Sequence, residues 1–188
     1  QKVDNISLLD LATGKGGDIP KWTYNKISNV VGIDIFKENI YNNIDGACVR
    51  RLNQINNMHK KKKAIPNMYF LVGNVGKSID NGDAFNSDDV SKQLWNKLWK
   101  TDEMGTNYSK NKFNIISIMF AIHYMFENKH ILNNLINNID NNLKKGGYLI
   151  GTCLDGELIF NMLKFISVNS NISGTNKGKK IWKIKKLY

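Results

Sequence analysis

The chain has 188 residues, close to the size of one domain, and 41% of them are apolar, which is enough to bury a core. Its formal charge of +11 favours a polyanionic partner, nucleic acid above all, because phosphate neutralisation drives such binding. No apolar run approaches the roughly 20 residues that span a bilayer, and no His/Cys cluster has metal-ligand spacing, which argues against a membrane span and a metal site.

The first half of the chain alternates strand-like and helix-like segments. Apolar runs at Ile6–Leu11 and Val30–Ile35 predict two buried strands. The glycine-rich turn after the first run leads into a helix that Asp18 can cap, with Pro20 tolerated in its first turn. The other elements of this half are a helix at Asn39–Asn57, a basic run at Lys60–Lys63 and a strand at Met68–Asn74.

The second half continues this alternation. It predicts helices at Asp88–Trp99, Lys129–Leu143 and Glu157–Phe165, and strands at Phe113–Phe120 and Tyr148–Leu154. Gly146 and Gly147 are expected to end the second of these helices. The stretch KKIWKIKKL, residues 179–187, alternates apolar and basic residues as a half-exposed strand does. Further expectations are mobile surface loops at Lys60–Lys63 and Met104–Lys112, and buried thiols without a disulfide at Cys48 and Cys153.

Strands that alternate with helices predict an α/β fold, a parallel sheet with helices on both faces. In such sheets the ligand lies outside the carboxyl ends of the strands. Chemically suggestive residues follow four of the predicted strands: Ala12–Gly17, Asp34, Asn74 and Met119–Tyr124. Their agreement in position predicts one ligand site at this edge of the sheet.

The turn after the first strand reads ATGKGG, residues 12–17. Gly14, Gly16 and Gly17 let the backbone approach a ligand where a Cβ would collide. The turn lacks the spacing of a Walker A loop, and Ile19 stands where a dinucleotide fingerprint needs its third glycine. A tight strand-to-helix turn without a ligand is the alternative.

Polar residues end the next two strands. Asp34 lies about 20 residues after the glycine turn and can accept both ribose hydroxyls of a nucleoside, although a helix N-cap is the alternative. Asn74 can pair with the edge of an adenine ring through one donor and one acceptor, or it can form a turn. Both residues therefore favour a nucleoside ligand.

The segment MFAIHYMFEN, residues 119–128, follows the fourth strand. Phe120, Tyr124 and Phe126 can form an aromatic wall that stacks on flat rings. His123 is a candidate ligand contact, although a lone histidine in an apolar run is more often a core residue or a surface tip.

These segments resemble the mRNA cap guanine-N7 methyltransferases. The resemblance rests on GKGGDIPKW at Gly14–Trp22, on GIDI, on FAIHYMFEN and on LKKGGYLIGTCLDG, and it extends from Ser7 to about Leu187. It implies a Rossmann-like class I methyltransferase fold, with a mainly parallel sheet of the seven-stranded type, and S-adenosylmethionine as cofactor. Residues 1–188 would form a single domain that lacks family segments before the first strand and after the last.

The resemblance also implies site residues. Those facing the cofactor are Ala12, Gly14, Asp34, Asn74, Met119, Phe120 and Tyr124. Those facing the cap are Lys15, Lys21, Arg50 (with Arg51 as the alternative), His123 and Tyr124. Asn74 stands where the family usually has an acid, and Met119 where many members have glutamine. The resemblance implies no residue that acts as acid or base. Tyr124 and His123 are instead expected to align the reactants.

The implied function is methyl transfer from S-adenosylmethionine to N7 of the guanine cap of mRNA. The implied partners are capped RNA and, as further candidates, the guanylyltransferase and triphosphatase of the capping apparatus. A cellular source would place the protein in the nucleus and a viral source in the cytoplasm. The alternatives are a methyltransferase acting on another RNA or a small molecule, and an inactive methyltransferase-like RNA-binding module. A dehydrogenase is the weakest alternative.

Overall fold

The computed structural model describes residues 5–60 and 65–187. The chain divides into two compact units, residues 1–153 and 154–188, and each is described by itself. The expectation of one domain over residues 1–188 stays a prediction. The run Lys60–Lys63 lies outside the described residues except for Lys60, which ends a helix.

Unit 1 is built on a five-stranded sheet in the order β3-β2-β1-β4-β5, with every neighbouring pair parallel. Its strands are β1 (Ser7–Asp10), β2 (Asn29–Asp34), β3 (Asn67–Val72), β4 (Phe113–Met119) and β5 (Leu143–Thr152). All five were expected from the sequence. Because the strands run in one direction, the carboxyl ends of β1 to β4 meet at one edge of the sheet.

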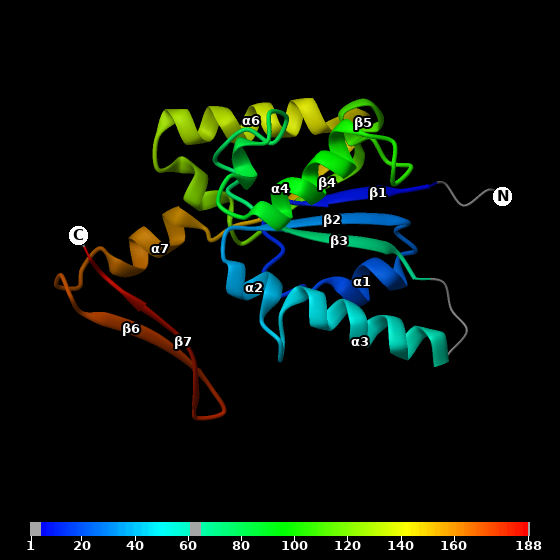
Figure 1. Ribbon diagram of the computed structural model, residues 1–188. Coiled ribbons are helices and arrows are strands. Elements are labelled where there is room, and N and C mark those ends of the chain that lie inside the picture. The colour runs from blue at the N-terminus through cyan, green and yellow to red at the C-terminus, as the bar shows by residue number, and fades with distance from the viewer. Residues whose placement is uncertain (1–4, 61–64, 188) are drawn as a thin grey trace. The chain divides into compact units, whose positions relative to one another are not determined.

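Helices cover both faces of this sheet (Figure 1). One face carries α1 (Ile19–Tyr24), α2 (Lys37–Tyr41) and α3 (Ala47–Lys60), and the other carries α4 (Asp89–Trp95) and α6 (Lys129–Asn142). Leu8 belongs to a buried cluster with Trp22 and Ile40, and the next residue, Leu9, belongs to a second cluster with Leu135. This division follows from the alternation of side chains along a strand. It confirms the expected α/β fold with a doubly covered parallel sheet, but among the described residues this sheet has five strands rather than the seven-stranded type that the resemblance implied, because β6 and β7 pair only with each other.

Shorter elements complete unit 1. They are the 3-10 helices η1 (Asp83–Phe85) and η3 (Ile122–Phe126), the π-helical turn η2 (Asn96–Lys100) and the helix α5 (Tyr108–Asn111). Of the helix expected at Asp88–Trp99, the first part is α4 and the last part is η2.

The helix expected at Asn39–Asn57 is wrong, because the chain forms two helices there. Asn42 ends α2: its Oδ1 accepts hydrogen bonds from the backbone N–H groups of Ile44 (2.8 Å) and Asp45 (3.0 Å). Such local side-chain bonds compete with helix continuation. Gly46 closes the turn, since a Cβ there would lie 2.6 Å from the carbonyl oxygen of Asn42.

The segment Met104–Lys112 is not a surface loop throughout. Tyr108 is buried, its ring stacks on Phe113 with centroids 4.1 Å apart, and it meets Trp99 edge-on at 5.5 Å. Thr106 is also buried and donates its hydroxyl hydrogen to the carbonyl oxygen of Leu98. Aromatic burial therefore fixes a segment whose polar composition resembles that of a loop.

Three smaller expectations also differ from the structure. Asp18 precedes α1 but does not cap it, because its carboxylate accepts a hydrogen bond from Lys21 Nζ instead. Helix α6 ends at Asn142, before the glycine pair, and Gly146 (φ +78°) and Gly147 lie within β5. Cys153 is exposed rather than buried, whereas Cys48 is half-buried; both are free thiols, as expected.

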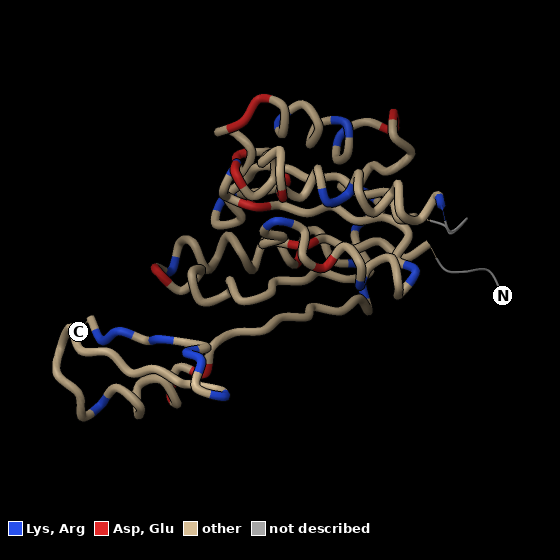
Figure 2. Tube along the Cα trace, turned by 90° about the horizontal axis from the view of Figure 1, so that it is seen from below, with Lys and Arg blue, Asp and Glu red and all other residues tan. Residues whose placement is uncertain are grey.

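Unit 2 contains α7 (Gly156–Leu163) and an antiparallel hairpin of β6 (Asn171–Asn176) and β7 (Lys179–Lys185). The strand expected over residues 179–187 is thus confirmed, and it pairs with β6 rather than with the parallel sheet. Lysine occurs in both units, whereas the two arginines, Arg50 and Arg51, belong to unit 1; Figure 2 marks lysine and arginine in blue. Among the described helices, none is long and apolar enough to cross a membrane.

Candidate functional site

A cavity of about 490 Å³ lies at the carboxyl edge of the sheet. It is lined by residues that follow β1, β2, β3 and β4, and by residues of η3 and the start of α6. Five residues expected to contact the cofactor line it: Ala12, Asp34, Asn74, Met119 and Tyr124. Its volume lies in the range of small-molecule sites, and its wall is mainly apolar with a few polar groups, which is typical of such sites.

Asp34 ties the glycine turn to the end of β2. One carboxylate oxygen accepts a hydrogen bond from Gly14 N (2.8 Å), and the other accepts from Phe36 N (2.9 Å) and Asn39 Nδ2 (2.9 Å). Gly14 has a φ of +54°, a conformation that glycine adopts without strain. The three donors fix the carboxylate and use three of its roughly four acceptor sites, which leaves about one for a ribose hydroxyl.

Asn74 both lines the cavity and forms a turn. Its Oδ1 accepts a hydrogen bond from Gly76 N (2.9 Å), which uses one of the two lone pairs of this oxygen. The turn alternative is therefore confirmed, and Asn74 lines the cavity as well. Pairing of its amide with the adenine edge stays a prediction.

Met119 and Phe120 end β4 in different ways. Met119 lines the cavity, and its sulfur accepts a weak hydrogen bond from the hydroxyl of Thr152. Phe120 has a φ of +53°, which is strained for an aromatic residue, and its ring is 64% exposed and outside the cavity lining. A role of Phe120 in cofactor binding stays a prediction.

Tyr124 lies on the rim of the cavity, on η3, and His123 is its neighbour on the same element. Tyr124 lines the cavity yet is 66% exposed, and the centroid of its ring lies 4.2 Å from that of His123. His123 is exposed, so the alternative of a core histidine does not apply. An aromatic pair at the mouth of a cofactor-sized cavity is suited to hold a second flat ring next to the first ligand.

The cations expected to bind the cap phosphates fall into two places. Lys15 forms an ion pair with Asp45 (2.7 Å), and Arg50 Nε donates to the backbone carbonyl oxygen of the same residue (2.9 Å). Lys15 and Arg50 thus lie together beside the glycine turn. Lys21 lies on α1 and pairs with Asp18, whose hydrogen bond raises the pKa of this lysine.

Arg51, the alternative to Arg50, is half-buried on α3. Its Nε is buried without a hydrogen-bond partner among the described residues. Arg50 is exposed, and its contact with Asp45 gives it the position beside Lys15 that the phosphate role requires. The role itself stays a prediction.

A buried acid, Asp10, lies directly beneath the glycine turn. It is 3% exposed at the end of β1, and its carboxylate accepts a hydrogen bond from Ala12 N (3.4 Å). Its pKa is raised to about 7, chiefly by burial; the nearby carboxylates of Asp18 and Asp34 also raise it, and hydrogen bonds from Ala12 and Ser117 lower it.

Sequence reasoning missed several residues that line the cavity. They are Leu11, Ile35, Phe36, Asn39, Gly73, Val75, Ala121, Met125, Glu127 and Ile131. Phe36 and Val75 lie within two residues of expected ligands, so their place after a strand could have indicated them. Glu127 and Ile131 reach the cavity through the fold of η3 onto α6, which no local pattern reveals. Within the described residues, no group of acids, histidines or cysteines could hold a metal ion.

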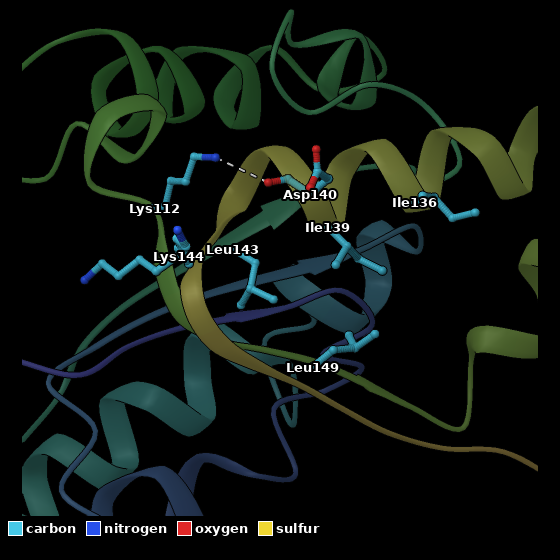
Figure 3. Close-up of a pocket in the computed structure, with 8 residues that line it drawn as sticks. Lys112, Ile136, Ile139, Asp140, Leu143, Lys144 and Leu149 are labelled. Atoms are coloured by element: carbon cyan, nitrogen blue, oxygen red, sulfur yellow. Dashed lines mark hydrogen bonds between the residues drawn. The ribbon is translucent and has the colours of Figure 1, made fainter.

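A second cavity, of about 580 Å³, lies between α6 and β5 (Figure 3). Its floor is formed by Ile136, Ile139 and Leu149, and Lys112 Nζ donates to the carbonyl oxygen of Asp140 across it. Lys112 precedes β4, and Leu143 begins β5, so the lining comes largely from the amino ends of these strands. It contains none of the expected ligand contacts.

The sequence is similar to a known protein family and to several curated relatives. The family model described as mRNA (guanine-N(7))-methyltransferase domain matches residues 1–186. The chain is 32% identical over 197 residues to a probable mRNA-capping enzyme of Acanthamoeba polyphaga mimivirus, covering 98% of this chain and 15% of that protein. It is 27% identical over 161 residues to the mRNA cap guanine-N(7) methyltransferase of Schizosaccharomyces pombe, covering 86% of this chain and 35% of that protein.

Among solved structures, an S-adenosylmethionine-dependent methyltransferase from Clostridium acetobutylicum aligns with a TM-score of 0.49 and 14% identity, over 92% of this chain and 51% of that chain. The chain spans 15% of the length of the mimivirus relative and 35% of the length of the Schizosaccharomyces pombe relative. Because the family model matches nearly every residue, the chain belongs to the mRNA (guanine-N(7))-methyltransferase domain family, which is S-adenosylmethionine-dependent.

Proposed function

We propose that this protein binds S-adenosylmethionine in the cavity at the strand ends and methylates N7 of the guanine cap of mRNA. The observation that carries the proposal is that five expected cofactor contacts, from four separate strands, meet in one cavity inside a chain that belongs to this family. The substrate of the reaction is capped RNA, and the other capping activities are its proposed partners.

The residues present fit the cofactor. Asp34 has acceptor capacity for the ribose, and Asn74 Nδ2 is a donor for the adenine edge. S-adenosylmethionine supplies a methyl group that is activated by a positively charged sulfur.

The protein's own contribution is alignment. The N7 lone pair of guanine is free at neutral pH, so no general base is required. Tyr124 and His123 would hold the guanine ring against the cavity mouth, while Lys15 and Arg50 would bind the triphosphate bridge. Such positioning supplies on the order of 7–11 kcal/mol of a bimolecular barrier.

Calorimetric titration and a transfer assay test the proposal. We expect S-adenosylmethionine to bind this chain in the micromolar range, and GpppG to bind the saturated complex. Incubation with capped RNA should give N7-methylguanosine, whereas RNA capped with 7-deazaguanosine, which lacks N7, should remain unmethylated. Absence of cofactor binding would contradict the proposal, and methylation of the 7-deaza cap would assign the reaction to another atom.

Replacing Tyr124 with alanine should reduce turnover more than cofactor affinity. The ring lies on the rim and is 66% exposed, so it can contribute more to the alignment of guanine than to the burial of the cofactor. We expect kcat to fall about 100-fold, a fraction of the gain that orientation supplies, and the Kd of S-adenosylmethionine to change less than about threefold. Tyr24→Ala, which removes an exposed ring on α1, is the matched control. Equal losses in kcat and affinity would refute the alignment role.

A further inference from the structure

The end of the chain carries charge of one sign. Seven lysines lie between Leu154 and Tyr188, and no Asp or Glu follows Glu157. Six of these lysines, from Lys177 onward, lie in or beside the β6–β7 hairpin, where Figure 2 shows blue segments along the trace. A basic segment that has no acidic residues of its own favours a polyanionic partner.

The pairing register sorts the hairpin into two faces, because directly opposed residues of an antiparallel pair share a face. Lys183 lies opposite Ser173, and Lys185 lies opposite Asn171. On the other face, Trp182 lies over Gly174, where a Cβ would come within 2.3 Å of the indole nitrogen. Ile184 lies opposite Ile172 on this second face, and both are half-buried.

A bulge adds a third lysine to the polar face. The register shifts between Gly174 and Thr175, so that Lys180, rather than Ile181, lies opposite Thr175. Bulges of this kind re-aim side chains. The resulting face, which we call the cationic face, consists of Lys180, Lys183, Lys185, Asn171, Ser173 and Thr175, and all six residues are exposed.

We propose that the cationic face binds the phosphate backbone of the RNA beyond the cap. The inference rests on the proposed function, since it concerns the body of the same substrate. Lys183 and Lys185 are two residues apart on one strand, about 6.6 Å, a spacing suited to successive phosphates of an extended single strand. Hydroxyl and amide donors stand between the lysines, as in backbone contacts to nucleic acids. The six residues of the face are polar or charged, and the exposed Ile181 at the bulge is too small an apolar surface to enter a bilayer, which favours RNA over a lipid surface.

The test measures binding of an uncapped 20-nucleotide RNA at several salt concentrations. In the triple variant Lys180→Gln, Lys183→Gln, Lys185→Gln we expect about tenfold weaker binding near 0.1 M salt, and a log–log salt dependence that is shallower by about two. The variant with arginine at the same three positions should keep the wild-type slope. GpppG and S-adenosylmethionine should bind the glutamine variant as they bind the wild type.

The matched control replaces three exposed lysines of unit 1, Lys77, Lys110 and Lys129, with glutamine. An equal loss in this control would mean that only net charge matters, and an unchanged slope in the hairpin variant would mean that no phosphate lies there; either result overturns the proposal. Equal binding of the wild type to phosphatidylserine vesicles, lost in the same variant, would assign the face to lipid instead. Failure of the wild type to bind cofactor and cap analogue would contradict the proposed function alone. The binding of uncapped RNA by the wild type and the variants is measured without either ligand and therefore tests the cationic face independently.

Discussion

Replacement of Asp34 with alanine should reduce the affinity for S-adenosylmethionine at least about 100-fold. The variant would lose the hydrogen bond from a ribose hydroxyl to this carboxylate, worth about 1.5–3 kcal/mol when the acceptor is charged. The glycine turn would also lose its anchor, since Gly14 N, Phe36 N and Asn39 Nδ2 all donate to this carboxylate. Asp34→Asn should fail as well, because the amide presents a donor where the site supplies donors.

Calorimetry with two nucleosides isolates the ribose contact. Wild-type protein should bind adenosine more tightly than 2′,3′-dideoxyadenosine, and the Asp34→Ala variant should bind both equally. Asp102→Ala removes an exposed acid from a turn outside the cavity and serves as the matched control for charge. If Asp34→Ala kept within threefold of the wild-type affinity, the nucleoside assignment of this strand end would be wrong.

Asp10→Asn should raise the stability of the protein at pH 8. The pKa of Asp10 is raised from 3.8 to about 7, chiefly by burial, so between these values the folded state holds a proton that the unfolded state releases. The contribution of Asp10 to the free energy of unfolding is therefore fully present below pH 4 and is lost as the pH rises through 7. The free energy of unfolding decreases by about 4 kcal/mol over this range, at about 1.4 kcal/mol per pH unit. The asparagine variant does not titrate and avoids this cost.

Thermal unfolding at several pH values checks the sign. We expect the Tm of Asp10→Asn to exceed that of the wild type by roughly 8–16 °C at pH 8, and the two values to converge near pH 4. Asp88→Asn is an informative contrast. Burial would raise the pKa of Asp88, but hydrogen bonds from Lys37, Ser91 and Tyr41 outweigh burial and lower it to about 2, so this variant should lose stability at pH 8. A lower Tm for Asp10→Asn at pH 8 would show that its carboxylate is stabilised by groups not accounted for.

The sequence determined the order and type of the main elements. Apolar runs of four to eight residues are typical of buried parallel strands, and β1 to β4 lie where these runs predicted them. Strand β5 contains most of its predicted run, but it begins at Leu143 and is largely exposed. The hairpin strand β7 was equally visible in its alternation. These are local signals, because strand burial on both faces requires an uninterrupted apolar run whatever the rest of the fold.

The candidate site was predicted in part for the same reason. In a parallel sheet every residue that follows a strand reaches one edge, so Ala12, Asp34, Asn74 and Met119 could be placed together from the chain alone. The hydrogen-bond partners of these and the neighbouring residues could not be predicted in this way. Asn74 Oδ1 accepts a hydrogen bond from Gly76 N, and Lys15 and Arg50 both contact Asp45, for which no local pattern predicted a role.

Only the tertiary structure decided the remaining features. The break between α2 and α3 depends on Asn42 and on the close approach at Gly46, and the burial of Tyr108 depends on rings supplied by Trp99 and Phe113. The raised pKa of Asp10 likewise needs strands on both sides of β1 and two other acids nearby. Each depends on contacts between residues distant in the sequence or on exact backbone geometry, whereas propensity and periodicity describe only the chain's immediate neighbours.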